Sequence, residues 1–321
     1  MNTMKNIEPK SIEPKSIEPY IGFEQGPIRP PSEAESLLVR ISRNCPWNRC
    51  TFCGLYKGTK FSLRPVDHVL SDIDTIRFYV DAIEAAGKAG GTISQRELYN
   101  LSPNGGKADL QALHAAAKFV ANGKKSIFIQ DGNSLVIKPE NIIRILRHLK
   151  EAFPKVERVT SYARSHTIAR ISDENLSHMA GAGLNRIHIG MESGSDKVLK
   201  MVKKGTDKAT QIIAGQKVKR AGIELSEYFM PGLGGKTLTR ENALETADAL
   251  NQIDPDFIRL RTLALPATAP LTGQFNEGTF DKMGEVDTAR ELLLWLEKLA
   301  GITSTIRSDH VLNLFPEIDG V

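Results

Sequence analysis

Cysteine is scarce in this sequence, with three copies among 321 residues. Cys45, Cys50 and Cys53 all lie in one stretch, RNCPWNRCTFCGLY, and no cysteine occurs before or after it. An odd and tightly clustered set excludes a framework of disulfides that would join distant parts of the chain. Metal binding or redox chemistry is the better interpretation of such a cluster.

Long apolar runs and blocks of like charge are also absent. No stretch reaches the roughly 18 apolar residues that a membrane-spanning helix needs, and the opening MNTMKNIEPKSIEPK lacks the apolar centre of a secretory signal. The 42 Lys and Arg are scattered and nearly balanced by 38 Asp and Glu, which leaves a formal charge of +4. We therefore expect a cytoplasmic protein without a membrane partner, and the charge does not indicate nucleic acid as a partner.

The chain divides into an extension, a repeating body and a C-terminal part. The extension, residues 1–33, carries the repeat NIEPK, SIEPK, SIEPY, whose prolines do not fit inside a regular helix or a central strand. We predict a core domain over residues 34–265 and a C-terminal extension over residues 266–321. The C-terminal part contains the helical pattern VDTARELLLWLEKLAG, and we expect it to form a helical cap that packs on the core.

Short β-rich runs alternate with longer amphipathic stretches in the core. This alternation predicts an α/β fold with parallel strands joined by helices, either as a closed or partial barrel or as an open doubly wound sheet. The six predicted strands are residues 37–42, 126–130, 158–162, 186–191, 224–230 and 257–262. Residues 64–125 break the rhythm, and we interpret about 88–106 as an insertion that serves either as a lid or as a plain connector.

Polar and glycine-rich signatures follow the predicted strands directly. The cysteine stretch follows the first strand, DGNS the second, YARSH the third, MESGSD the fourth, MPGLGG the fifth and LALPATAP the sixth. The carboxyl ends of parallel strands meet at one edge of a sheet or barrel. We therefore predict that these signatures form a single site.

Three clustered thiolates are compatible with two kinds of metal site. Zinc would need a fourth ligand such as His68, which lies in a helical pattern, and structural zinc sites commonly use two ligand pairs. A four-iron, four-sulfide cluster held by three thiolates leaves one iron free to bind a small molecule. The second arrangement explains why the loop has no fourth cysteine, because the iron without a protein ligand is the one that binds the small molecule.

The stretch CPWNRCTFC resembles the cluster loop of the radical S-adenosylmethionine (radical SAM) superfamily, including the aromatic Phe52 before the last cysteine. The resemblance covers about residues 36–265 and points to the cobalamin-related and porphyrin-oxidase-like branch, without a cobalamin domain. It implies a partial (β/α)6 TIM-like barrel, with Cys45, Cys50 and Cys53 binding a 4Fe-4S cluster and S-adenosylmethionine on the free iron. The gap between the first two cysteines is one residue longer than is usual, which an irregular loop can absorb.

The resemblance implies roles for residues at two other strand ends. Asp131, Gly132 and Asn133 stand where the family has a Gly-Gly-Glu-like turn whose backbone receives the methionine ammonium group. The carboxylate of Asp131 is expected to accept from this ammonium group and Gly132 to permit close approach of the backbone, although an ordinary tight turn is the alternative. Glu192 in GMESGSD is expected to accept hydrogen bonds from the ribose hydroxyls of the cofactor.

Further candidates come from the third, fifth and sixth strands. Arg164 in YARSH is expected to neutralise the methionine carboxylate, or alternatively to make a structural ion pair. Gly232 in MPGLGG lets the backbone approach adenine or substrate, unless the glycine string is a turn without ligand contact. Arg259 and Arg261 share one face of the sixth strand, where they bind substrate or cofactor or form a buried ion pair.

The resemblance implies an enzyme that reductively cleaves S-adenosylmethionine to a 5′-deoxyadenosyl radical, which acts on a substrate that the sequence does not identify. A low-potential electron donor such as flavodoxin or ferredoxin is the expected partner. Because no cysteine lies outside the loop, enzymes with a second cluster or a catalytic cysteine are excluded. The alternative is a non-catalytic iron-sulfur or zinc-binding module with a regulatory or sensing role.

Overall fold

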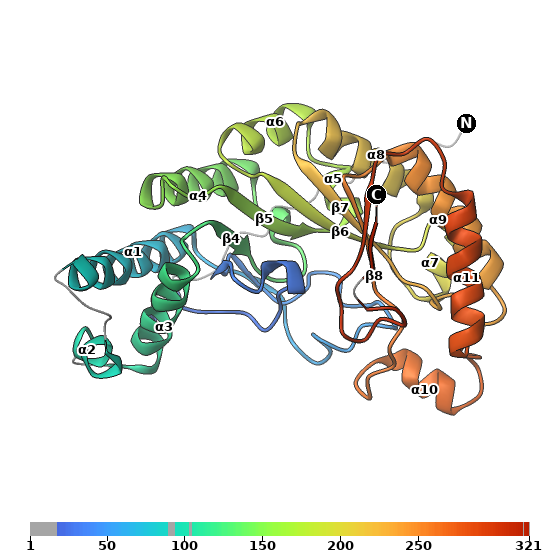
Figure 1. Cartoon of the computed structure of the whole chain (residues 1–321), viewed down its shortest axis with the longest axis horizontal. Coiled ribbons are helices and arrows are strands. Elements are labelled where there is room, and N and C mark those ends of the chain that lie inside the picture. Colours follow the sequence, from blue (N-terminus) through green and yellow to red (C-terminus); the bar gives the residue numbers. More distant parts are fainter. Residues whose placement is uncertain (1–17, 89–93, 103–104, 317, 321) are drawn as a thin grey trace.

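One curved sheet of eight strands organises the chain (Figure 1). The computed structural model describes residues 18–88, 94–102, 105–316 and 318–320. Strand neighbours pair in parallel from β1 to β9, and β10 is antiparallel to β9. In order across the sheet, the strands are β1 (Leu37–Val39), β4 (Ser126–Ile129), β5 (Arg158–Ala163), β6 (Arg186–Glu192), β7 (Glu224–Phe229), β8 (Phe257–Leu260), β9 (Thr305–Ser308) and β10 (Ile318–Gly320).

The strand order follows the chain order without a reversal. A doubly wound sheet contains a point at which the order reverses, so the observed order identifies the barrel architecture. In the described part of the chain, β1 and β10 are the two edges of the sheet. The predicted partial TIM-like barrel is confirmed, and the six predicted strands correspond to β1, β4, β5, β6, β7 and β8.

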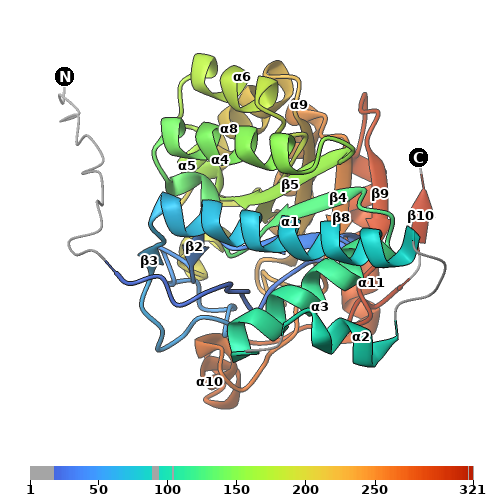
Figure 2. The ribbon, with the colours of Figure 1, turned by 90° about the vertical axis from the view of Figure 1, so that its left-hand side faces the viewer.

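Helices cover the outer face of the sheet (Figures 1 and 2). Helix α1 lies beside α3 and α4, and α9 lies beside both α8 and α11. The helices are α1 (Val66–Lys88), α2 (Gln95–Asn100), α3 (Lys107–Ala121), α4 (Pro139–Ala152), α5 (Ser165–Ile168), α6 (Asp173–Gly181), α7 (Asp196–Met201), α8 (Lys208–Arg220), α9 (Thr239–Ile253), α10 (Pro270–Asn276) and α11 (Glu285–Lys298). The chain also forms two 3-10 turns, η1 (Pro31–Glu33) and η2 (Ser134–Val136). Strands β2 (Ser42–Arg43) and β3 (Ser62–Leu63) form a small separate hairpin.

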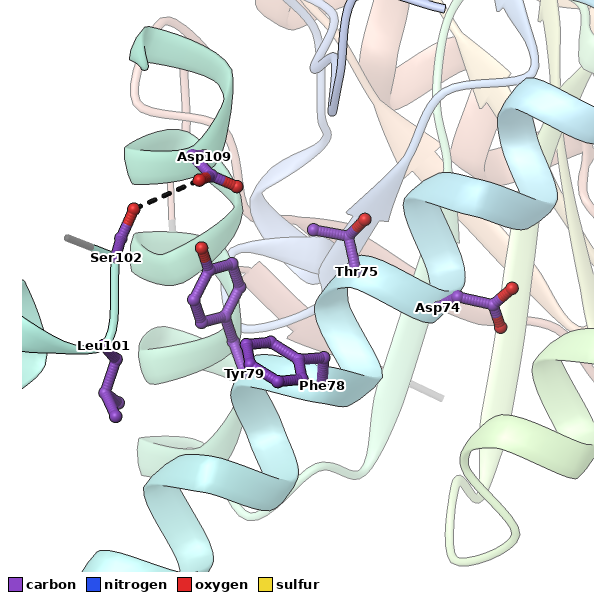
Figure 3. Close-up of a pocket in the computed structure, with 7 residues that line it drawn as sticks. All are labelled: Asp74, Thr75, Phe78, Tyr79, Leu101, Ser102 and Asp109. Carbon is purple, nitrogen blue, oxygen red and sulfur yellow. Dashed lines mark hydrogen bonds between the residues drawn. The ribbon is translucent and has the colours of Figure 1, made fainter. Parts of the chain in front are cut away.

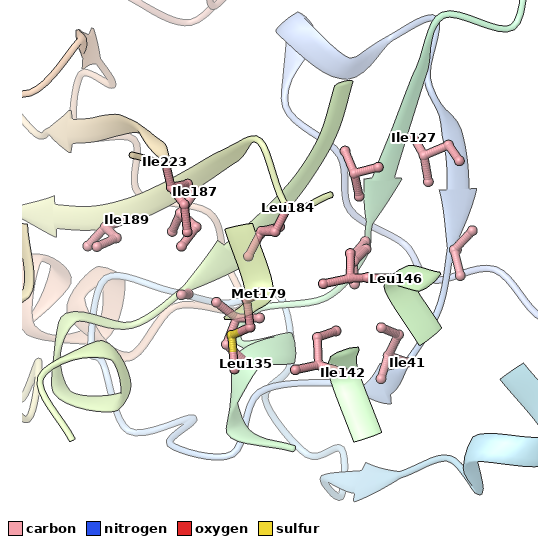
Figure 4. Packing of buried hydrophobic residues seen from close by; sticks show 14 of the residues in the cluster. Ile41, Ile127, Leu135, Ile142, Leu146, Met179, Leu184, Ile187, Ile189 and Ile223 are labelled. Carbon is pink, nitrogen blue, oxygen red and sulfur yellow. The ribbon is translucent and has the colours of Figure 1, made fainter. Parts of the chain in front are cut away.

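The main apolar core lies between the sheet and the helices (Figure 4). Because side chains alternate along a strand, Ile127 and Ile129 of β4 point to this outer layer, whereas Phe128 points into the barrel. Helix α4 contributes Ile142 and Leu146, one turn apart and both fully buried. Each such side chain stabilises the fold by roughly 1.5–3 kcal/mol through removal of its surface from water.

Aromatic rings fill the inside of the barrel. Phe128, Tyr162, His188 and Tyr228 come from four successive strands, and their ring centroids are 5.2 Å apart for Phe128 and Tyr162, 5.6 Å for Tyr162 and His188, and 5.8 Å for His188 and Tyr228. The interior is therefore a packed core, as in other barrels of this architecture. The predicted site residues, which lie at or beyond the ends of strands, are at the rim outside this core.

The described part of the predicted N-terminal extension, residues 18–33, is fastened to the barrel. The amide of Gly26 donates to Oε1 of Gln130 over 2.8 Å, and Nε2 of Gln130 donates to the carbonyl of Ile28 over 3.0 Å. Glu33 in η1 is fully buried, accepts from Ser36 and lies 3.3 Å from Arg158. The first two units of the proline repeat lie outside the described residues, as does the start of the third.

The C-terminal extension supplies more than the predicted helical cap. Helices α10 and α11 form, and the chain then adds β9 beside β8 and returns as β10. Strand β9 was not predicted, because its four residues lack a clear alternation of apolar and polar side chains. Sheet pairing to β8, rather than a local pattern, makes this segment a strand.

The predicted insertion, about residues 88–106, lies partly outside the described residues. In its described part, α2 begins with a capping box between Ser94 and Glu97. A groove of about 490 Å³ lies where the end of α2 meets α1 and α3 (Figure 3). Its lining includes Tyr79 and Asp109 but none of the predicted site residues. No described helix is long and apolar enough to cross a membrane.

Glu33 gives a stability prediction. Burial alone would raise the pKa of this carboxyl, but contacts with His188, Ser36 and Arg158 lower the pKa to about 2. Replacement by Gln removes charge-assisted contacts, so Glu33→Gln should lower the free energy of unfolding at pH 7 by about 2 kcal/mol in denaturant titrations. Because the folded-state pKa is depressed, this difference should shrink as pH falls from 4.5 towards about 2.

Glu35→Gln is the matched control, because Glu35 is exposed two residues further along the chain. Its unfolding curve should coincide with that of the wild type. Equal stability of Glu33→Gln and the wild type at pH 7 would contradict the role of Glu33 as a fastener of the N-terminal segment.

Candidate active site

Backbone hydrogen bonds hold the cysteine loop at the rim of the barrel. The loop lies between β2 and β3. The amide of Thr51 donates to the carbonyl of Val202 at the end of α7, and the carbonyl of Thr51 accepts from the amide of Leu271 in α10, both over 2.9 Å. A Cβ on Gly54 would lie 2.1 Å from the hydroxyl of Thr268. The loop is therefore tied to two other segments of the rim, and glycine is required at its end.

The longer gap between the first two cysteines forms a left-handed turn at Asn48. Its φ is +45°, a conformation that asparagine tolerates better than most residues. Nδ2 of Asn48 donates to the carbonyl of Tyr56 over 2.5 Å, and Nζ of Lys57 donates to the carbonyl of Asn48 over 2.7 Å. The additional residue is thus absorbed within a hydrogen-bonded loop, as the sequence predicted.

Trp47, in the same gap, has two guanidinium groups close to its ring. Arg49 and Arg164 lie 5.1 and 4.9 Å from the centre of its ring, and its indole N–H donates to the carbonyl of Lys203 over 2.8 Å. A Cβ on Gly205 would lie 2.3 Å from the indole. The tryptophan therefore joins the cysteine loop to the segment after α7, and cation-π attraction contributes to this contact.

The three cysteines are free thiols that are each partly buried. Burial raises the pKa of Cys50, and the nearby positive charges of Lys204 and Arg164 act in the opposite direction. Cys45 lies against the predicted turn, because a Cβ on Gly132 would come within 3.6 Å of its Sγ. In the described ranges, no three His, Cys, Asp or Glu side chains come together closely enough to hold a single metal ion.

Asp131 points away from open solvent. It is fully buried with a φ of +71°, and its two carboxylate oxygens accept from Tyr56 Oη over 2.8 Å and Arg40 Nε over 2.6 Å. Burial and the neighbouring Asp131 raise the pKa of Tyr56, which stays protonated and donates. The observed role of the Asp131 side chain is to fix the end of the cysteine loop.

Asn133 connects two strand ends. Its Oδ1 accepts from the amide of Arg164 over 3.1 Å, and its Nδ2 donates to the hydroxyl of Thr167 over 2.8 Å. The guanidinium of Arg164 donates to the carbonyl of Lys204 over 2.7 Å. Arg164 pairs with no carboxylate in the part of the chain that the structure describes, so the predicted alternative of a structural ion pair is not observed there.

Glu192 meets Lys204 and Phe52 at the end of β6. Nζ of Lys204 donates to Oε1 of Glu192 over 3.0 Å and lies 5.6 Å from the centre of the Phe52 ring. Glu192 has a φ of +67°, and a Cβ on Gly190 would lie 2.3 Å from its Oε1. The glycine two residues earlier therefore makes room for the carboxylate to fold back over the rim.

Lys204 is the main residue that sequence reasoning missed. It follows α7 in the stretch MVKKGTD, where two adjacent lysines resemble an exposed helix end. Its low exposure, 7%, and its contact with Glu192 arise only when this segment folds back on β6. Ser195 caps the start of α7, because its hydroxyl accepts from the amide of Val198.

Gly232 lies in a turn that is tied to the C-terminal extension. Its φ of +86° favours glycine, and its amide donates over 2.9 Å to Oε1 of Glu291 in α11. Thr239 and Asn242 also donate to this buried carboxylate. Burial raises the pKa of Glu291. No described hydrogen bond joins Gly232 to the residues around Cys50 and Glu192, so its predicted contact with the cofactor stays a prediction.

The segment after β9 adds two residues that the sequence did not predict at the site, Asp309 and His310. Arg259 forms an ion pair with Asp309, and Arg261 forms a hydrogen bond with Nδ1 of His310. Both partners follow the end of β9. For Arg259, the buried ion pair proposed as an alternative is the observed arrangement.

Comparison with known proteins identifies the family of the chain. The family model "Radical SAM superfamily" matches residues 39–247, which is more than half of the chain. The chain is 28% identical over 233 residues to 4′-phospho-dehydrooxetanocin synthase of Priestia megaterium, covering 68% of this chain and 26% of that protein. It is 22% identical over 154 residues to tRNA uridine(34) acetyltransferase of Methanocaldococcus infernus, covering 47% and 28%. The chain thus spans less than a third of either relative.

Solved structures show a similar fold. Methylornithine synthase superposes with a TM-score of 0.50 and 14% identity, covering 85% of this chain and 64% of that one. Coproporphyrinogen III oxidase from Escherichia coli superposes with a TM-score of 0.52 and 16% identity, covering 82% and 52%. At these identities the likeness concerns the fold alone. On the match of the family model, the chain belongs to the radical SAM superfamily, a class of enzymes whose cofactors are a 4Fe-4S cluster and S-adenosylmethionine.

Proposed function

We propose that the chain binds a 4Fe-4S cluster through Cys45, Cys50 and Cys53 and cleaves S-adenosylmethionine reductively to act on a substrate that is still unknown. The observation that carries this proposal is the set of three free thiols in one rim loop, beside the glycine turn after β4. When bound, the reduced cluster supplies the electron that breaks the sulfonium bond and releases a 5′-deoxyadenosyl radical. The residues of this chain bind and orient the reactants.

The donor set fits a cluster of this kind. Thiolates are the ligands of iron-sulfur clusters, and a positive environment favours the thiolate over the thiol. Lys204 and Arg164 both act on Cys50 in this direction. The same two cations offset the negative charge that three thiolates would bring to one loop.

Residues around the loop support a site for S-adenosylmethionine. Glu192 is proposed to accept from the ribose hydroxyls, with Phe52 packing beside it, and Arg164 to balance the methionine carboxylate. Lys204 is added to this set because it bridges Glu192 and the cysteine loop. Gly232 is proposed to let the backbone of its turn approach the adenine.

The turn after β4 is proposed to meet the methionine end of the cofactor through Gly132 and Asn133. The carboxylate of Asp131 is assigned to another task, because Arg40 and Tyr56 already bind its oxygens and the residue is fully buried. Backbone groups of the turn thus replace the carboxylate as the proposed partners of the ammonium group. Reduction by flavodoxin or ferredoxin, and a place in the cytoplasm, are further proposals.

The proposed function is tested by anaerobic iron-sulfide reconstitution of the full chain, followed by low-temperature electron paramagnetic resonance after dithionite reduction. A four-iron signal that shifts on addition of S-adenosylmethionine, together with formation of 5′-deoxyadenosine, is the expected result. A protein that retains zinc, or a cluster that is indifferent to the cofactor, would instead favour a non-catalytic metal-binding module.

Replacement of Cys50 should remove the cluster. Cys50→Ala leaves two thiolates in the loop, so iron content should fall well below that of the wild type and 5′-deoxyadenosine formation should stop. Iron and sulfide analysis of the reconstituted protein gives the first readout and product chromatography the second. Full iron content in this variant would exclude Cys50 as a ligand.

Replacement of Glu192 should separate cofactor binding from cluster assembly. Glu192→Ala removes the proposed partner of the ribose, and loss of a hydrogen bond to a charged group weakens binding of S-adenosylmethionine by roughly ten- to a hundredfold. Iron content should not change. Equilibrium binding of the cofactor measures the effect, and Glu241→Ala on the exposed surface of α9 is the control. Unchanged binding in Glu192→Ala would exclude the ribose assignment.

A further inference from the structure

Three arginines on the inner face of the described barrel have a carboxylate partner. Nη2 of Arg158 lies 3.3 Å from Glu33, and Nη2 of Arg186 lies 2.7 Å from Glu224. Arg259 pairs with Asp309. Such pairing is expected, because a cation removed from water without compensation is costly. The pattern makes an inward-facing arginine without a carboxylate partner informative.

Arg261 is such a residue. It lies just beyond the end of β8, where its amide still donates to the carbonyl of Phe229 over 2.9 Å, so the alternation that turns Arg259 inward extends to Arg261. Among the described residues it forms no ion pair, and its side-chain hydrogen bond is to His310. The side chain is partly buried, and this burial lowers the pKa of Arg261. A partly buried cation is thus paired with a neutral ring at the rim.

The contact with His310 fixes the tautomer of the imidazole. Nδ1 of His310 faces Arg261 and also accepts from the amide of Leu312 over 3.0 Å. Because both neighbours donate, Nδ1 is the unprotonated nitrogen and Nε2 carries the proton. The pair therefore offers two kinds of donor, the remaining N–H groups of the guanidinium and the N–H at Nε2.

Asn313 holds this arrangement in place. Its Nδ2 donates to the carbonyl of Leu260 and to the hydroxyl of Ser308, both over 2.9 Å, and its Oδ1 accepts from the amide of Thr262 over 3.0 Å. Asn313 is 7% exposed. The turn that carries His310 is thus fastened to the end of β8 by a buried amide, so the donors of Arg261 and His310 are organised in advance.

The pair belongs to the same rim as the proposed cofactor site. Glu192, Tyr162 and Tyr228 are the groups that interact electrostatically with Arg261, and Glu192 is the residue assigned to the ribose. Arg261 is therefore within electrostatic range of the proposed reaction site without being part of the cysteine loop. Arg164 and Lys204 are assigned to the cluster and cofactor, which leaves Arg261 for another anion.

We propose that Arg261 and His310 form a subsite for an oxyanion, a carboxylate or a phosphate, on the substrate of this enzyme. The proposal rests on the proposed function, since it names a property of the substrate bound at that rim. Arginine binds both anions through paired N–H groups, and the N–H of a neutral histidine adds a donor in a fixed direction. The subsite would orient the substrate against the cofactor and takes no part in bond breaking.

The test uses the full chain, reconstituted with its cluster and supplied with S-adenosylmethionine, with its histidines selectively labelled for nuclear magnetic resonance. His310→Gln identifies the signal of His310 by its loss. Inorganic phosphate and acetate are titrated separately into the wild type. We expect a saturable shift of the His310 signal with one or both probes, and the probe that binds more tightly identifies the oxyanion.

Arg261→Gln should raise the half-saturating concentration at least about tenfold, because the charge and the paired donors are lost together. Arg290→Gln is the control, because it removes an exposed arginine on α11. Its phosphate and acetate titrations should match those of the wild type. Where Arg261→Gln does not fold, Arg261→Lys replaces it. This variant keeps the charge without the paired geometry, and should weaken binding by about threefold or more.

Absence of a saturable shift with either probe would overturn the subsite, and so would equal affinity in the Arg261 variants and the wild type. These results would leave the proposed function untouched, because that function is tested on the wild type through 5′-deoxyadenosine. Conversely, a wild type that never forms 5′-deoxyadenosine, yet binds phosphate or acetate through Arg261, would retain the anion site and lose the proposed reaction.

Discussion

Parallel pairing in chain order is the constraint on which the rest of this structure depends. In the eight-stranded sheet, β1, β4, β5, β6, β7, β8 and β9 all run in the same direction, so their carboxyl ends reach the same rim. The rings packed inside the barrel deny the interior to ligands. The candidate site is therefore formed by the loops that follow the strands. The sheet already places these loops side by side, and contacts between the loops fix their positions.

The loops are fixed mainly by backbone groups and by cations. Thr51 ties the cysteine loop to two other segments through its own amide and carbonyl, which any residue could provide. The ring of Trp47 contacts the guanidinium groups of Arg49 and Arg164, and Lys204 donates to Glu192. These positive charges secure the loop, and they also oppose the rise in the pKa of Cys50 that burial causes.

Several carboxylates near this rim bind donors of the chain itself. Asp131 is buried by Arg40 and Tyr56, and Glu291 receives three donors from the turn and helix that follow β7. Glu33 does the same at the opposite end of the sequence, inside the barrel. An acidic residue at a strand end is therefore not by itself a ligand. Its role depends on whether cations of the same chain have already reached it.

The resemblance of the cysteine stretch to the radical SAM superfamily narrowed two possible architectures to the barrel. The sequence pattern by itself determined the α/β class with parallel strands, the position of the cysteine loop and the gathering of the strand-end signatures. Those features follow from periodicity and from the spacing of three cysteines, which are local in the chain. The strand ends of β4, β5 and β6 did bring Asn133, Arg164 and Glu192 to the rim as predicted, whereas the cofactor contacts of these residues stay predictions.

Only the tertiary structure decided the partners of the charged side chains. Lys204 reaches Glu192, Asp131 turns to Arg40, and His310 meets Arg261 across 49 positions of the sequence. The short strand β9 and its turn exist because β8 offers an unpaired edge, and no pattern within their own residues specifies them. The physical reason is that hydrogen bonds and ion pairs depend on distance in space, and distance in space is set by the packing of the whole barrel.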